Sequence, residues 1–243
     1  MSRIEFSALS EHGLSDRNDD AYCAEQIGDY FVLAIADGLA GHPNGSLASV
    51  TAIEAFRKAI KNTTGPAREV LLAGVRHADA AIRTLSERSP DHTGLATSLV
   101  ACLIDKKMQC TILDPGEKNC IVITERTVEN ARKAAMSRHT HGSGSVPYTA
   151  PPPPSLSEMI SHVLGAPRRL KATDFSEFML GEEFLLLSSD GLTDVLRDDA
   201  IAAIVRKNAG NLGVACEVLV QEAMKAGSGS TITVVLSHRS PGV

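Results

Sequence analysis

Apolar and polar positions follow two different periods along the chain, and each period predicts one kind of element. Short apolar runs typical of buried strands cover residues 31–36 and the stretch that starts at residue 184. Other strand patterns cover residues 3–10, 95–105, 108–113, 118–125 and 231–237. Apolar residues at helical spacing predict helices over residues 46–60, 67–87, 198–208 and 211–226.

These elements predict a fold class. The three strand patterns between residues 95 and 125 are separated by tight turns, which indicates an antiparallel meander. Ser46 is the predicted N-cap of the first helix. Strands that pair through short turns, with helices on either side, predict an α+β protein. We expect a four-layer α/β/β/α sandwich of two antiparallel sheets flanked by helices.

One stretch interrupts the pattern. Residues 137–157 are rich in Ser, Gly and Pro, with four consecutive prolines at 151–154. Such a composition cannot pack a core and favours extended backbone. Because strand patterns resume after it, we expect a mobile flap inside a single domain that spans residues 1–243.

Composition excludes several classes of function. The chain has 243 residues, 43% of them hydrophobic, which is enough for one large globular domain. A net charge of -5 gives no basic surface for nucleic acid, and no apolar run reaches the length of a membrane span. The five cysteines show no metal-ligand spacing. They are typical of buried thiols in a reducing cytoplasm, where we therefore expect the protein.

Two of the apolar runs end in the same dipeptide. The first runs into Asp37-Gly38 and the second into Asp190-Gly191. One such ending is explained by a simple turn. Two endings place two carboxylates at the mouths of buried strands, where a divalent cation would neutralise them. We therefore expect Asp37 and Asp190 at the same end of the sandwich, across one metal site.

An acidic loop precedes the first of these runs. Asp16, Asp19 and Asp20 lie close together in sequence, with only Arg17 as a counter-charge. The loop is either a solvated turn or a source of further carboxylates for the metal site.

Five segments in this order resemble the type 2C family of metal-dependent protein phosphatases, in its compact prokaryotic form. They are NDDAY, IADGLAGHPNG, LATSLV, LLLSSDGLTDVL and GSGSTITVV, and together they span nearly the whole chain. The resemblance implies two divalent cations, Mn²⁺ or Mg²⁺, in a cleft at one end of a β-sandwich. It also implies hydrolysis of phosphate esters by a water that bridges the two metals.

The resemblance implies roles for individual residues. Asp37 would bridge both metals, the Gly38 carbonyl would bind one and Asp190 the other. Asp19 or Asp20 would hold one metal through water. His42 would either protonate the leaving alkoxide or brace its loop.

Several positions depart from the family pattern. An Asp-Asn pair is replaced by Ser230-Thr231, which removes one metal ligand and should weaken one of the two metal sites. The phosphate-binding Arg is replaced by Ser15, with Arg17 displaced nearby as its substitute. The Gly-Asp-Ser-Arg turn is replaced by DPGEKN, where Asp114 is the nearest acidic residue. Asp194 or Asp20 could serve as a substitute ligand.

Two interpretations of function follow. The first is a metal-dependent Ser/Thr phosphoprotein phosphatase with a reduced ligand set. The second is a catalytically impaired phosphatase-like module that binds a phosphoprotein or a signalling partner. The retained Asp37, Gly38 and Asp190 favour the enzyme, whereas Ser230 and Ser15 favour the binding module. The substrate and the oligomeric state are not encoded in these motifs.

Overall fold

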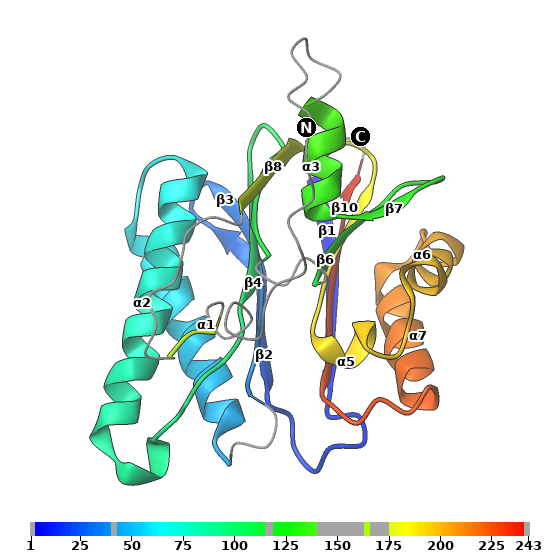
Figure 1. Cartoon of the computed structure of the whole chain (residues 1–243). Helices are drawn as coiled ribbons and strands as arrows, with labels where there is room; N and C mark the ends of the chain where they lie inside the picture. Colours follow the sequence, from blue (N-terminus) through cyan, green and yellow to red (C-terminus); the bar gives the residue numbers. More distant parts are fainter. Residues whose placement is uncertain (1–2, 40–42, 115–118, 140–162, 166–174, 241–243) are drawn as a thin grey trace.

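Two five-stranded antiparallel sheets stack face to face, and helices cover the outer face of each sheet (Figure 1). They are seen in a computed structural model that describes residues 3–39, 43–114, 119–139, 163–165 and 175–240. The predicted α/β/β/α sandwich is confirmed.

The first and last strands of the chain lie side by side in one sheet. This sheet, called the β10 sheet here, has the order β1 (Arg3–Glu11), β10 (Ile232–Ser240), β9 (Phe184–Ser188), β6 (Cys120–Ile123) and β7 (Val128–Asn130). The other, called the β3 sheet, has the order β2 (Asp20–Ile27), β3 (Tyr30–Asp37), β4 (Val100–Asp105), β5 (Gln109–Leu113) and β8 (Phe175–Met179).

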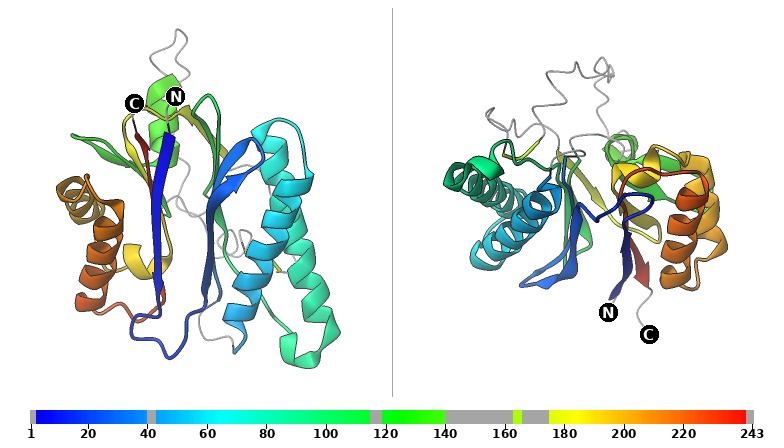
Figure 2. Two further views of the ribbon diagram at one scale, coloured as in Figure 1. Left: turned by 180° about the vertical axis from the view of Figure 1, so that it is seen from behind. Right: turned by 90° about the horizontal axis from the view of Figure 1, so that it is seen from below.

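Each sheet has its own pair of helices. Figures 1 and 2 show α1 (Gly45–Asn62) and α2 (Ala67–Arg88) on the β3 sheet, and α6 (Asp198–Lys207) and α7 (Leu212–Lys225) on the β10 sheet. The shorter α3 (Ala131–His139) contacts β6 and β8, η1 (Pro90–His92) follows α2, and α5 (Asp190–Thr193) follows β9. No helix in these described ranges is both long and apolar enough to cross a lipid bilayer.

Three apolar layers hold the four layers of structure together. Phe56 lies between the α1–α2 pair and the β3 sheet, Leu33 between the two sheets, and Leu219 between the β10 sheet and α6–α7. All three side chains are fully buried. Burial of one such side chain stabilises the fold by about 1.5–3 kcal/mol. The sheet ends lie outside these layers and are free to carry polar groups.

The predicted meander is wrong at its third strand. β4 and β5 pair as expected, but β5 then pairs with β8, and β6 belongs to the other sheet between β9 and β7. All four residues of β6 are buried. A strand that is apolar on both faces needs a central position, which the β10 sheet provides.

Other boundaries differ by small amounts. β4 begins at Val100 and not at residue 95, because Thr97 forms only isolated bridges with Gly38 and Leu164. The strands β2, β7 and β8 were not predicted, since none of them has a long apolar run. The predicted flap over 137–157 begins inside α3, and its residues after His139 lie outside the described residues.

Candidate active site

Two aspartates face each other where β2 and β3 meet. Asp20 begins β2, Asp37 ends β3, and the antiparallel register pairs them directly. Directly opposed side chains lie on the same face of a sheet, about 4.5–5.5 Å apart at Cβ. Asp20 is 7% exposed, and neither of its carboxylate oxygens has a hydrogen-bond partner among the residues that the structure describes. Two buried oxygens without a donor mark a place where a positive charge is missing.

The pKa values of Asp20 and Asp37 reflect this lack of positive charge. Burial raises the pKa of Asp20 to about 6, and the hydroxyls of Thr233 and Ser189 oppose the shift without satisfying its oxygens. Burial, and then the negative charges of Asp20 and Asp190, raise the pKa of Asp37 to about 8. Acids crowded in this way are not all charged at neutral pH unless a cation compensates them.

Asp190 reaches the site from the other sheet. β9 ends at Ser188, and Asp190 is the first residue of the single-turn helix α5. Its backbone N–H donates to the carboxylate of Asp37. The side-chain amide of Asn119 donates to Asp190 Oδ1 at 3.0 Å. The structure therefore brings Asp37 and Asp190 to the same end of the sandwich.

The glycine after each aspartate allows a close backbone approach. A Cβ on Gly38 would lie 2.3 Å from the carbonyl oxygen of Gly45, and one on Gly191 would lie 2.0 Å from that of Thr231. Real Cβ atoms do not come so close to backbone, so neither position accepts a side chain. Packing against backbone thus requires the glycine of each Asp-Gly pair.

Asp19 and Asp20 have different roles. Asp19 Oδ1 accepts the backbone N–H of Ser46 in the first turn of α1 at 3.0 Å. Ser46 is therefore not the N-cap: the cap position is Asn44, whose side chain makes no capping bond. An aspartate from another element satisfies the helix terminus instead. Of the acidic pair, Asp20 is the member placed opposite Asp37.

The start of β10 contributes hydroxyl groups. Ser230 is exposed, whereas Thr231 is 5% exposed and its hydroxyl accepts the backbone N–H of Asp19 at 3.1 Å. The Ser189 hydroxyl donates to the Thr231 carbonyl at 3.2 Å. Asp194, the suggested substitute ligand, is the exposed C-cap of α5.

The predicted phosphate-binding residue, Arg17, lies in the acidic loop. The Arg17 guanidinium donates to the carbonyl of Pro43 at 2.6 Å and lies 3.9 Å from Asp19 Oδ1. Ser15 sits in the turn below it, where its N–H donates to the carbonyl of His12. His42 lies outside the described residues.

The donor set fits a hard divalent cation. The side chains of Asp20, Asp37 and Asp190 offer only oxygen ligands. Neither carboxylate oxygen of Asp20 accepts a hydrogen bond within the described part of the chain. Oxygen ligands are what Mg²⁺, Mn²⁺ and Ca²⁺ prefer. Within the described part of the chain, no three His, Cys, Asp or Glu side chains form a ready-made metal cage. A cation here would therefore keep several waters, as Mg²⁺ commonly does.

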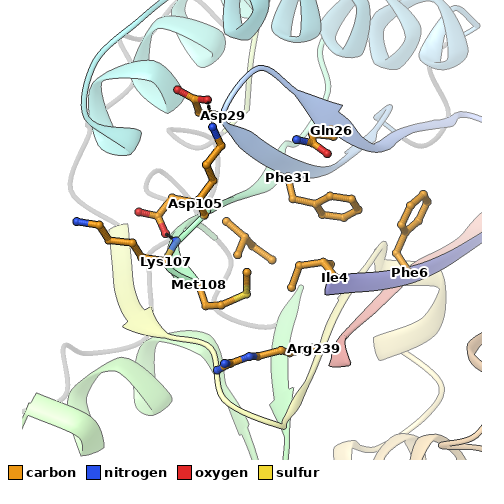
Figure 3. Close-up of a pocket in the computed structure, with 11 residues that line it drawn as sticks. Ile4, Phe6, Gln26, Asp29, Phe31, Asp105, Lys107, Met108 and Arg239 are labelled. Atoms are coloured by element: carbon orange, nitrogen blue, oxygen red, sulfur yellow. Dashed lines mark hydrogen bonds and ion pairs between the residues drawn. The ribbon is translucent and has the colours of Figure 1, made fainter. Parts of the chain in front are cut away.

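A groove lies at the opposite end of the sandwich. Its volume is about 810 Å³, and Ile4, Phe6, Phe31 and Met108 form its apolar walls (Figure 3). Phe31 is near the start of β3 and Asp37 at its end, so the two places are roughly 20 Å apart at about 3.3 Å per residue.

The acids of this groove already have partners. Asp29 pairs with Lys106 at 2.6 Å. Asp105 Oδ1 accepts the backbone N–H groups of Lys107 and Gln109 at 2.8 Å. Because these acids are already paired, the aspartates at the other end of the sandwich remain the candidate site.

The structure adds two residues that sequence reasoning did not single out for a role. Asn119, the last residue of the DPGEKN turn, bonds Asp190, and Thr231 bonds the backbone of Asp19. Both positions were noted only as departures from a family pattern. Their function depends on a pairing between distant strands, and no local pattern signals it.

Comparisons with known proteins point in one direction. A family model described as "Protein phosphatase 2C" matches residues 172–232, a segment that includes β9 and α5. The "Serine/threonine phosphatase stp" of Listeria welshimeri is 24% identical over 215 residues, covering 86% of this chain and 84% of the relative. The "Serine/threonine protein phosphatase PstP" of Mycobacterium tuberculosis is 25% identical over 252 residues, covering 96% of this chain and 45% of the relative.

Solved structures share the fold. The serine/threonine phosphatase PstP/Ppp of Mycobacterium tuberculosis matches with a TM-score of 0.71 at 22% identity, covering 97% of this chain and 98% of that one. The catalytic domain of PstP "in complex with 2 Manganese ions" gives 0.73 at 22% identity, covering 99% and 100%. A bacterial serine phosphatase gives 0.76 at 21% identity, covering 99% and 100%.

Proposed function

We propose that the chain is a member of the protein phosphatase 2C family and a metal-dependent hydrolase that removes phosphate from phosphoserine and phosphothreonine in proteins. One observation carries this proposal. Asp20 and Asp37 face each other at the end of one sheet, Asp190 reaches them from the other sheet, and neither carboxylate oxygen of Asp20 has a partner among the described residues. A purely structural cluster of acids would be satisfied by basic side chains or N–H donors.

In this proposal, the three aspartates together would bind Mn²⁺ or Mg²⁺. Asp37 pairs with Asp20 in the strand register and interacts with Asp190, so it would share a cation with either, and the Gly38 carbonyl would supply a further oxygen ligand. Cations bound there lower the pKa of water and neutralise the oxygens of a phosphoryl group. The chain supplies the fixed, mostly buried frame of carboxylates, so little reorganisation is needed when substrate arrives.

The cysteines of the chain are poor candidates for a nucleophile. All five cysteines are buried, and burial raises the pKa of Cys23 to about 12 and of Cys216 to about 11. Such thiols are inert, because the thiolate is the reactive form. A cysteinyl-phosphate mechanism is therefore disfavoured, and direct attack by water agrees best with the residues present.

Further assignments extend this proposal. Arg17 is placed beside the acidic loop and would contact the phosphate or steer it, once its bond to Pro43 opens. His42 would act near the leaving group. The substrates would be phosphoproteins of a signalling system, and the free buried thiols favour a reducing compartment such as the cytoplasm.

The test is hydrolysis of p-nitrophenyl phosphate and of a phosphothreonine peptide with and without Mn²⁺. Asp37→Asn should lower turnover by more than the roughly 100-fold that outer-shell changes reach. Asp29→Asn is the matched control, because Asp29 lies at the far end of the sandwich and is paired with exposed Lys106. It should leave turnover unchanged.

The result separates the two interpretations of the sequence. Mn²⁺-dependent turnover that Asp37→Asn removes supports the enzyme. Mn²⁺ binding without turnover in the unaltered chain would favour the phosphoprotein-binding module, which is suggested by serine at position 230 in place of the family's carboxylate.

A further inference from the structure

Asn119 links a strand end to a site carboxylate. It directly precedes β6, and its carbonyl accepts the backbone N–H of Ser188 at 2.9 Å. Its side-chain nitrogen donates to the Ser188 carbonyl at 3.0 Å and to Asp190 Oδ1 at 3.0 Å. Both partners are acceptors, so only the NH₂ end of the amide, with its two hydrogens, satisfies both.

We propose that Asn119 is a positioning residue for the metal site: its amide fixes the Asp190 carboxylate beside Asp37 while leaving the negative charge of that carboxylate intact. The inference rests on the proposed function and deepens it. It concerns how this chain orients one ligand, whereas the proposed function concerns what the ligands do.

The chemistry of the donor decides the effect. A lysine or arginine at this position would orient Asp190 equally well, but its charge would compete with the cation for the carboxylate. A neutral amide orients the carboxylate without that competition, as outer-shell partners of metal ligands commonly do. The bond to Ser188 holds the amide itself, because it ties the side chain to the strand that ends two residues before Asp190.

The position of Asp190 explains why such support is needed. α5 is a single turn, and Asp190 is its first residue, beyond the last pair of β9 with β10 at Ser188. Asp20 and Asp37, by contrast, are residues of paired strands. The ladder of β2 and β3 fixes the backbone of those two acids, whereas Asp190 lies past the end of its ladder.

The experiment measures Mn²⁺ affinity by titration calorimetry on the full chain, which does not depend on turnover. Asn119→Ala and Asn119→Leu both remove the donor, and the leucine keeps most of the volume. Each should weaken Mn²⁺ binding by about 10–100-fold. Asn208→Ala is the matched control: its amide also donates to a carbonyl, that of Ile204 at 2.8 Å, but on α6. It should bind Mn²⁺ like the unaltered chain.

A double-mutant cycle distinguishes positioning from general support. In an Asp190→Asn background, where Mn²⁺ electron paramagnetic resonance follows weak binding, adding Asn119→Leu should have little further effect, because the two residues act through one carboxylate. An equal loss in both backgrounds would overturn the inference, and so would wild-type affinity in Asn119→Leu alone.

The same data show which proposal fails. If Asp37→Asn and Asp190→Asn bind Mn²⁺ like the unaltered chain, the metal site itself is misplaced. If those variants lose binding and Asn119→Leu does not, only the role of Asn119 is wrong.

Discussion

The β3 sheet contributes charged side chains to the site, whereas the β10 sheet contributes mostly neutral ones. On the β3 side, Asp20 and Asp37 are paired across two strands, and the oxygens of Asp20 have no hydrogen-bond partner in the described part of the chain. On the β10 side, Asp190 accepts a hydrogen bond from the neutral Asn119 amide, and the hydroxyls of Ser189 and Thr231 bond backbone groups nearby in the fold.

This difference predicts unequal metal binding. Affinity for a divalent cation rises with the number of negative ligands. An ion close to Asp20 and Asp37 should therefore bind more tightly than one that depends on Asp190 and the Ser230 region. Substitutions on the β3 side and on the β10 side should show which of the two determines the stability of the fold and which determines the affinity for the metal.

The largest effect on stability is expected at the two glycines that follow Asp37 and Asp190. Gly38→Ala and Gly191→Ala would place a Cβ within 2.3 and 2.0 Å of a backbone oxygen, respectively. Each should lower the free energy of unfolding by roughly 1–3 kcal/mol or more. Gly210→Ala, where a Cβ meets nothing within 4 Å, is the control. Urea unfolding measures all three, and a Gly38→Ala chain as stable as the control would contradict the close approach.

The second prediction concerns pH and the metal-free chain. The pKa values of Asp20 and Asp37 are raised to about 6 and about 8 from 3.8, so the folded state binds protons more tightly than the unfolded chain. Their contribution to stability is present below about pH 4 and is lost as pH rises through 6 and then 8.

The melting temperature in a chelator should therefore fall between pH 5 and pH 9. At about 2–4 °C per kcal/mol for a chain of this size, the fall should be several degrees. Asp37→Asn should flatten the profile, and saturating Mn²⁺ should remove most of the loss. A profile in chelator that rises over this range would show that the carboxylates already have partners.

The third prediction restores a negative charge on the β10 side of the site, which has fewer carboxylates. Ser230→Asp should strengthen the weaker Mn²⁺ site by about tenfold or more, since ligand charge tunes affinity over decades. It should also raise turnover at low Mn²⁺. Ser230→Asn, which has the same size without the charge, is the matched control. Equal calorimetric affinities for the two variants would place residue 230 outside the site.

The smallest effect on stability is expected at the hydrogen bond that joins Thr231, next to β10, to Asp19, next to β2. Thr231→Val removes the hydroxyl that accepts the backbone N–H of Asp19. Loss of one buried hydrogen bond should cost about 1 kcal/mol of stability. Thr231→Ser keeps the hydroxyl and should cost less. Chemical unfolding compares the two, and a larger loss for the serine would assign the role of Thr231 to its methyl group.

Much of the fold follows from the sequence because its elements are strongly periodic. The four long helices and the two buried strands before Asp37 and Asp190 have patterns that tertiary contacts do not override. The crossing between sheets after β5 was missed for a physical reason: a short strand that is buried on both faces carries no signal of which sheet it joins. The brief strands β7 and β8 carry still less information.

The site could be predicted only in part. The repeated Asp-Gly ending indicates two acids near one cation, because a buried carboxylate needs compensation wherever it lies. The different roles of Asp19 and Asp20 could not be seen, since they depend on which residue falls opposite Asp37 in the register. Asn119 and Thr231 act across 71 and 212 positions of sequence, beyond the reach of any local pattern.

The pairing of the first strand with the last has a consequence for synthesis in the cell. Arg3 pairs with Ser240, and Asp190 meets Asp37 only when the two sheets have docked. Contacts so far apart in sequence form late, because the whole intervening chain must first be ordered. A nascent chain on the ribosome therefore has all three aspartates long before it has a metal site. Newly made protein should gain the ability to bind Mn²⁺ in one late step, after β10 has left the exit tunnel.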